Sequence, residues 1–206
     1  MLAVPLDVGD PDQVADLATE VESSFGAPTV LCANAGVIGP FGELWEQQPA
    51  DVEWVFRVNV HGTLNLIRSF VPGMRRSGGQ RRVIVTGSDA CFLPMPYVAV
   101  YHATKHALVA ITEGLAMELD AAGSAVAVHL VCPLGVKAPR LLSPDRFAFR
   151  AGGTGMSTDT TNGRLLKDLY TSSTRSRPGT RSPQPFCGAW TRVPSTCIPM
   201  TDCKSR

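Results

Sequence analysis

Between residues 2 and 133, short apolar runs alternate with longer segments whose apolar residues recur at helical spacing. The runs are LAVPLDV (2–8), TVLCANAG (29–36), RRVIVTGS (81–88) and AVAVHLVCP (125–133). Continuous apolar runs of this length are typical of parallel strands that are covered on both faces. Strands that alternate with helices predict an α/β fold with a parallel sheet and right-handed crossovers. Ligands of such sheets bind beyond the carboxyl ends of the strands.

The expected helices lie between these runs. The first begins at Pro11, with Asp10 as its capping residue and Gln13 at its third position, and reaches about Ser24. The other two are predicted at about 50–75 and 98–121.

The character of the chain changes at residue 139. Residues 1–139 contain 8 Lys and Arg and 14 Asp and Glu, a net charge of −6, whereas residues 140–206 contain 11 and 4, a net charge of +7. The second part is rich in Ser, Thr, Arg, Pro and Gly and has too little apolar surface to offset the entropy of ordering it. We therefore expect an α/β domain over 1–139 and a disordered, low-order basic tail over 140–206.

Composition argues against several classes of function. The net charge of +1 and the absence of a basic stripe interleaved with aromatics predict no nucleic-acid partner. No apolar run approaches the roughly 20 residues of a membrane helix, so no membrane partner is expected either. The N-terminus turns acidic too early for a secretory signal, which predicts a cytoplasmic protein. The six cysteines and four histidines show no metal-ligand spacing with partners, so no metal is expected.

Polar residues follow three of the predicted strands: Asn34, Ser88 and the turn at Pro133. Each alone could be a turn residue, a cap or a strand stop. Tyr101 and Lys105 are four residues apart in a predicted helix, which places both side chains on one face. A neighbouring ammonium should favour the phenolate and lower the tyrosine pKa, so this pair is a tunable proton donor.

The order and spacing of these residues resemble the short-chain dehydrogenase/reductase family over about residues 3–139. The resemblance is carried by LDV (6–8), NAG (34–36), NVHG (59–62), Ser88, YHATK (101–105) and PLGVKA (133–138). It implies a Rossmann-like doubly wound parallel sheet, a partial dinucleotide-binding and catalytic domain over 1–139, NAD or NADP as cofactor, and a small alcohol or carbonyl substrate. The helices at 50–75 and 98–121 resemble those through which the family forms homo-oligomers.

The resemblance also implies roles for four catalytic residues. Tyr101 would be the acid/base for the substrate oxygen, and Lys105 would lower the Tyr101 pKa and hold the nicotinamide ribose. Ser88 would polarise the substrate oxygen. Asn59 would bend its helix locally and anchor a water that relays protons from Lys105.

Cofactor contacts are implied at three further places. Asp7 and Val8 match the adenine-contacting pair of the family, and Asn34, Ala35 and Gly36 match the wall beside the adenine ribose. Pro133 and Val136 match positions that line the nicotinamide carboxamide. Leu134 and Ala138 depart from the Gly and Thr that the family has there, which weakens the expected nicotinamide site.

The TGxxxGxG phosphate loop of the family lies well upstream of its LDV motif, which here begins at residue 6. We therefore expect an incomplete sheet that lacks the first two strands, the phosphate loop and the last strand. Three functions stay open: an NAD(P)-dependent oxidoreductase, a truncated non-catalytic family member unable to bind cofactor, and an isomerase or dehydratase on the same scaffold.

Overall fold

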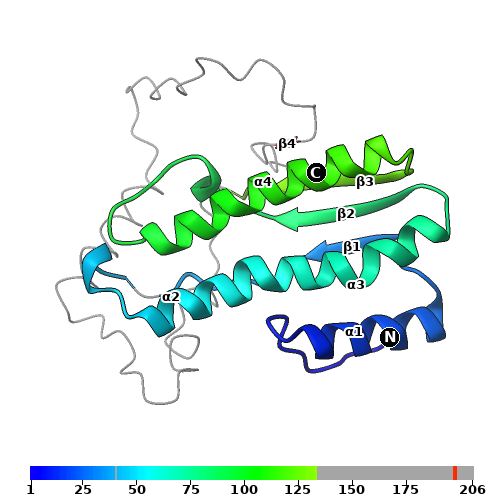
Figure 1. Cartoon of the computed structure of the whole chain (residues 1–206), viewed down its shortest axis with the longest axis horizontal. Coiled ribbons are helices and arrows are strands. Elements are labelled where there is room, and N and C mark those ends of the chain that lie inside the picture. Colours follow the sequence, from blue (N-terminus) through cyan, green and yellow to red (C-terminus); the bar gives the residue numbers. More distant parts are fainter. Residues whose placement is uncertain (40, 134–196, 199–206) are drawn as a thin grey trace, which may run out of the picture.

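The structure is a computed structural model that describes residues 1–39, 41–133 and 197–198 (Figure 1). Its helices are α1 (Pro11–Phe25), α2 (Pro49–Phe56), α3 (Gly62–Arg76) and α4 (Ala99–Ala121), with short helices η1 (Leu44–Glu46), η2 (Arg57–His61) and η3 (Asp89–Cys91). Its strands are β1 (Val30–Ala33), β2 (Arg81–Thr86), β3 (Val126–Val131) and β4 (Cys197–Ile198).

The strands form one sheet in the order β1-β2-β3-β4, and every pair is parallel. Ile84 in β2 lies between Cys32 of β1 and His129 of β3. In Figure 1, β1 and β2 point to the same end of the molecule, where the first turn of α4 also lies. The predicted parallel α/β fold is confirmed, and polar groups from several segments can meet at this end.

The strand β4 was not anticipated by the sequence analysis. Cys197 and Ile198 belong to the segment expected to be a basic tail, and they pair with Leu130 and Val131 of β3. The rest of 140–206 lies outside the described residues.

The first helix begins where the sequence predicts. The Asp10 side chain accepts hydrogen bonds from the backbone N–H groups of Asp12 (3.0 Å) and Gln13 (3.2 Å), and Pro11 is the first helical residue. Such bonds satisfy N–H groups that a helix leaves unpaired in its first turn. Gly26, with a φ of +77°, ends the helix.

The long helix expected at 50–75 is continuous but not uniform. α2 passes into η2, a five-residue π-helix, and η2 passes directly into α3. Asn59 is the middle residue of η2 and is fully buried. A π-helical turn is rare and often marks a functional position, because it bulges one residue out of the α-helical register.

The strand expected at 2–8 does not form, so this prediction was wrong. Residues 1–7 have no regular structure, and the chain turns at Val8 and Gly9 into α1. A strand needs a neighbour that takes up its backbone hydrogen bonds. Among the described strands, β1 pairs only with β2, and residues 7–9 instead contact η2 and α3.

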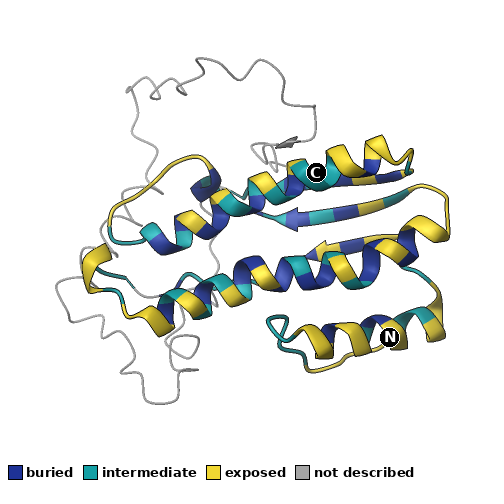
Figure 2. Ribbon diagram, in the orientation of Figure 1, coloured by how far each residue is buried: buried dark blue, intermediate teal, exposed yellow. Residues whose placement is uncertain are grey.

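The core lies between the sheet and the helices α3 and α4, with α1 packed against α3. Figure 2 shows the buried residues along the sides of α3 and α4 that face the strands. Alternate strand residues are buried, as in β1, where Leu31 and Ala33 are buried while Val30 and Cys32 are exposed. This packing fixes the positions of the strand ends relative to α4.

We predict that Val85→Ala lowers the free energy of unfolding by about 2 kcal/mol, because it removes two methyl groups from a packed site. Val85 is 0% exposed. Val30→Ala is the matched control, since Val30 is 45% exposed and its truncation should cost less than about 0.5 kcal/mol. Urea denaturation of both variants measures the difference, and equal losses would contradict this description of the core.

Candidate active site

Ser88 follows β2 and begins η3. Its Oγ accepts a hydrogen bond from the backbone N–H of Ala90 (3.2 Å) and donates to Asp89 Oδ1 (2.7 Å). The Ser88 backbone N–H is also in contact with Cys91 Sγ (3.4 Å). Ser88 is therefore held in a tight turn at the carboxyl end of the central strand, where the sequence predicts chemistry.

Tyr101 and Lys105 reach the same place from the first turns of α4. Lys105 Nζ donates to the carbonyl of Thr86, the last residue of β2, at 2.9 Å. It also lies 5.7 Å from the centre of the Tyr101 ring. Ser88 lies close enough to the Tyr101 phenol to lower its pKa. The three side chains thus converge at the end of β2.

The pKa of Tyr101 differs from the sequence-based expectation. It is raised above its ordinary value of 10.0, chiefly by burial, although the hydrogen bond with Ser88 lowers it. The expectation that Lys105 holds this pKa low was therefore wrong for this structure. The reason is geometric, because the ammonium lies over the ring and donates to Thr86 rather than to the phenol oxygen. Tyr101 is consequently a protonated phenol near neutral pH.

Lys105 is itself only 5% exposed, and burial lowers its pKa. Two thiols lie next to it. Cys91 Sγ donates to the Lys105 carbonyl (3.2 Å), and Cys132 at the end of β3 hydrogen-bonds with Cys91. That hydrogen bond and burial hold the pKa of Cys132 well above its usual range, so Cys132 is a neutral thiol beside the ammonium.

The side chain of Asn59 joins three segments. Its Oδ1 accepts from the Val37 N–H (2.8 Å), while its Nδ2 donates to the Val37 carbonyl (2.9 Å) and to Thr104 Oγ1 (2.9 Å). Thr104 in turn donates to the Tyr101 carbonyl (2.7 Å). The amide therefore ties the segment after β1 to η2 and to the turn of α4 that carries Tyr101 and Lys105.

Gly36 faces this group. A methyl group added at Gly36 would lie 3.5 Å from Asn59 Oδ1 and 3.8 Å from Lys105 Nζ. Its neighbours Asn34 and Ala35 are exposed at the end of β1. The predicted turn at 34–36 thus borders the same space as Lys105.

Asp7 and Val8 lie elsewhere, against η2 and α3. The Asp7 carboxylate accepts from the Gly9 N–H (2.9 Å) and pairs with Arg57 (3.1 Å). The Val8 carbonyl accepts from Asn65 Nδ2 (3.0 Å). These contacts fix the turn that leads into α1.

Pro133 borders the Ser88 turn, because its carbonyl accepts from the Asp89 N–H (3.2 Å). Val136, the other residue expected near the nicotinamide, lies outside the described residues.

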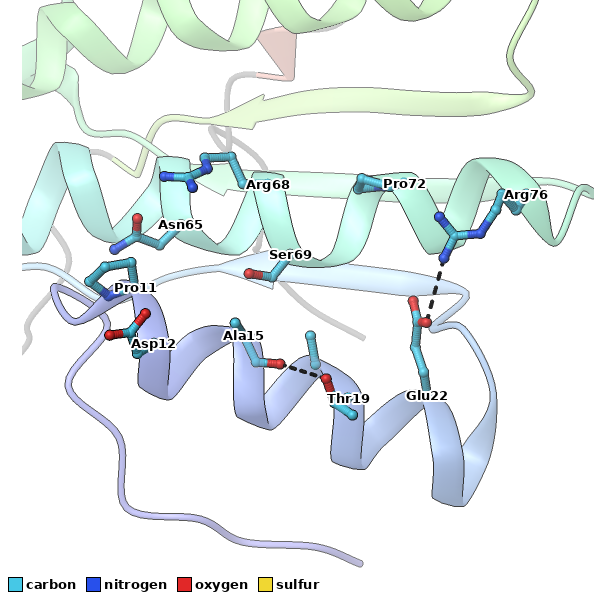
Figure 3. Close-up of a pocket in the computed structure, with 11 residues that line it drawn as sticks. Pro11, Asp12, Ala15, Thr19, Glu22, Asn65, Arg68, Ser69, Pro72 and Arg76 are labelled. Carbon is cyan, nitrogen blue, oxygen red and sulfur yellow. Dashed lines mark hydrogen bonds and ion pairs between the residues drawn. The ribbon is translucent and has the colours of Figure 1, made fainter.

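Two cavities lie away from this group. One, of about 420 Å³, opens between α1 and α3 and is crossed at one end by the Arg76–Glu22 ion pair of 3.7 Å (Figure 3). The other, of about 530 Å³, lies where α3 ends and β3 begins, at the amino end of the sheet. Neither is lined by Ser88, Tyr101 or Lys105, so cavity size alone would misplace the site.

The described residues contain no group of three or more His, Cys, Asp or Glu side chains that could hold a metal ion. None of the described helices is both long and apolar enough to cross a bilayer.

The sequence analysis missed two side chains that shape the site. Thr104 lies inside the YHATK motif but was given no role, and Asp89 follows Ser88 directly. An acidic residue beside a strand-end serine is a signal that the sequence offered. The Thr86 carbonyl, in contrast, is a backbone group, so its role as a hydrogen-bond acceptor for Lys105 cannot be predicted from the residue type.

Several known proteins are similar to this chain. The short chain dehydrogenase family model matches residues 1–144. The chain is 33% identical over 201 residues to 1-deoxy-11-beta-hydroxypentalenate dehydrogenase of Streptomyces arenae, covering 93% of this chain and 71% of that protein. It is 36% identical over 141 residues to an uncharacterized NAD-dependent oxidoreductase of Mycobacterium tuberculosis, covering 68% and 50%.

A solved structure is similar as well. A short-chain dehydrogenase/reductase from Burkholderia phymatum in complex with NAD superposes with a TM-score of 0.70 at 33% identity, over 86% of this chain and 62% of that one. The chain belongs to the short-chain dehydrogenase family. It is by family an oxidoreductase with a Rossmann-like fold, and it spans from half to about seven-tenths of the length of these relatives.

We predict that Asn59→Leu destabilises this short-chain dehydrogenase chain by roughly 2 to 4 kcal/mol, because it leaves the Val37 N–H and carbonyl unpaired in a part-buried place. Asn34→Leu is the matched control, since Asn34 is exposed, and it should change stability by less than about 0.5 kcal/mol. Urea denaturation measures both. A small effect at Asn59 would show that its amide does not hold the site together.

Proposed function

We propose that this chain is an NAD(P)-dependent oxidoreductase that transfers hydride between a nicotinamide cofactor and a small alcohol or carbonyl substrate. The observation that supports it is the convergence of Ser88, Tyr101 and Lys105 at the carboxyl end of β2. Ligands of parallel α/β sheets bind at this edge. A half-buried phenol with a buried ammonium 5.7 Å from its ring centre provides a proton donor and a second donor for a bound ligand.

Tyr101 is the acid/base in this proposal. During carbonyl reduction, negative charge grows on the substrate oxygen, and a donor already in place stabilises the transition state more than the ground state. The protonated Tyr101 phenol supplies this proton, and Ser88 positions the oxygen that receives it. In the reverse direction the Tyr101 phenolate takes the proton from the alcohol. Asn59 anchors the water through which Lys105 restores the Tyr101 proton.

The residues present fit a nicotinamide cofactor. Lys105 has three N–H donors, and its described hydrogen bond to Thr86 uses one of them. The others are available to ribose hydroxyls in the space beside Gly36, while Asn34 and Ala35 are exposed at its rim. Asp7, Val8, Pro133 and Val136 are proposed as further contacts on the basis of the family motif. When bound, the nicotinamide supplies or accepts the hydride, as NAD or as NADP.

The segment between η3 and α4 favours a substrate with an apolar body. Phe92 (55% exposed), Leu93 (63%) and Met95 (38%) present apolar side chains beside the Ser88 turn. Exposed apolar groups at the mouth of a polar site bind the non-reacting part of a ligand.

The assembly proposed for the chain is a homo-oligomer that pairs through residues 50–75 and 98–121. Met117, which is 71% exposed on α4, is an apolar group that such pairing would cover.

Direct titration of the purified chain with NAD(H) and NADP(H) tests the proposal. We expect saturable binding below millimolar concentration, followed by turnover with an alcohol or carbonyl panel. Tyr101→Phe should lower kcat by roughly 10²- to 10⁴-fold, the usual contribution of a general acid, while cofactor affinity changes little. The same substitution at Tyr170, outside the family match, should leave kcat unchanged. Absence of binding at millimolar cofactor would contradict the proposal and favour a non-catalytic family member.

The pH dependence follows from the raised pKa of Tyr101. Reduction requires the protonated phenol, so its rate should stay level through neutral pH and fall only as the pH passes the raised pKa. Oxidation requires the phenolate, so its rate should rise over the same alkaline range. Opposite slopes in initial-rate profiles would support Tyr101 as acid/base, and a reduction rate that falls between pH 6 and pH 8 (roughly the range in which an unperturbed histidine titrates) would contradict it.

A further inference from the structure

Two cysteines lie beside the candidate active site and have no role in the mechanism above. Cys91 belongs to η3 and is 2% exposed, whereas Cys132 follows β3 and is partly exposed. A methyl group added at Gly87 would lie 2.8 Å from Cys91 Sγ and 3.0 Å from Cys132 Sγ. Both distances are shorter than an ordinary van der Waals contact. The two sulfur atoms therefore share the space beside Gly87 that a side chain would otherwise occupy.

Backbone hydrogen bonds hold the two segments in this arrangement. The Gly87 N–H donates to the Val131 carbonyl (2.8 Å), and the Asp89 N–H donates to the Pro133 carbonyl (3.2 Å). The two carbonyls belong to the residues on either side of Cys132, and the two N–H groups belong to the turn that leads into η3. The end of β3 and this turn are thus one hydrogen-bonded unit, so the two sulfur atoms are kept together by the backbone.

Cys91 also contacts two of the proposed catalytic residues. Its Sγ lies 3.4 Å from the backbone nitrogen of Ser88 and 3.2 Å from the carbonyl oxygen of Lys105. A thiol can accept in the first contact and donate in the second, whereas a disulfide sulfur has no proton to donate. A chemical change at Cys91 Sγ therefore alters the support of both residues.

We propose that Cys91 and Cys132 form an oxidation site, at which hydrogen peroxide joins the two sulfur atoms in a disulfide. The peroxide oxidises one thiol to a sulfenic acid and releases water, and the second thiol then attacks that sulfur, which forms the S–S bond and releases a second water. The two thiols together lose two protons and two electrons, and the peroxide takes them up. The effect of this bond on catalysis rests on the proposed function, whereas its formation does not.

Cys132 is the thiol that the oxidant reaches first, because Cys91 is buried. The thiolate is the reactive form of a cysteine. The hydrogen bond with Cys91 and burial raise the pKa of Cys132, and the Lys105 ammonium acts against them without reversing the shift. The first step should therefore be slow at neutral pH and faster as the pH rises. The second step is intramolecular, which favours the disulfide over further oxidation of the sulfenic acid.

Peptide mapping of the full chain tests the proposal. Trypsin cleaves after Lys and Arg, so peptides 83–105 and 106–137 each contain a single cysteine, Cys91 and Cys132. The chain is treated with hydrogen peroxide at about pH 8.5, near the ordinary pKa of a cysteine thiol, and the remaining thiols are alkylated before digestion. We expect one linked species whose mass is two hydrogens below the sum of the two peptides, and dithiothreitol should separate it. The same treatment at neutral pH should give a lower yield.

Cys32 supplies the matched control, since it is exposed and lies in a different peptide, 1–57. Cys32→Ser should leave the yield of the linked species unchanged, whereas Cys132→Ser should abolish it. The proposal would be overturned if peptides 83–105 and 106–137 stay unlinked when Cys32 is fully oxidised, or if Cys132 is found linked to another cysteine instead.

An equal yield from the chain unfolded in urea would also overturn the proposal, because the folded arrangement beside Gly87 would then contribute nothing. The mapping needs neither cofactor nor substrate, so a failure of cofactor binding would be a separate result.

Discussion

The side-chain amide of Asn59 is the contact on which the geometry of the site depends. It pairs with both backbone groups of Val37 and with Thr104, so one buried side chain connects the segment after β1, the π-helical turn and the first turns of α4. An amide buried at 0% exposure is costly unless its donors and acceptor are satisfied. The same three bonds that satisfy it place Gly36 beside Lys105, and Lys105 beside Tyr101.

Burial, rather than the neighbouring ammonium, decides the protonation of Tyr101. Lys105 is directed to a strand-end carbonyl, and the low dielectric around Tyr101 disfavours the phenolate. The environment thus supports a tyrosine that gives a proton.

The sequence predicted those parts that depend on local patterns. The period of the apolar residues predicted α1, α3, α4 and three strands. The four-residue spacing of Tyr101 and Lys105 predicted that both lie on one face of a helix. It did not predict that residues 2–8 would stay irregular, because strand formation depends on a neighbour that the segment itself does not encode. Nor could it give the raised pKa of Tyr101, since the direction of the Lys105 ammonium is set by the Thr86 carbonyl in another element.

Amide hydrogen exchange at Val37 tests the central contact most directly. Val37 lies outside every described helix and strand, and its N–H is bonded to the Asn59 side chain. The account predicts that this amide is protected to a degree comparable with the amides of β1, while the exposed Ala35 two residues earlier exchanges rapidly. If Val37 exchanges as fast as Ala35 in the folded chain, Asn59 does not join these segments and the arrangement of the site described above is wrong.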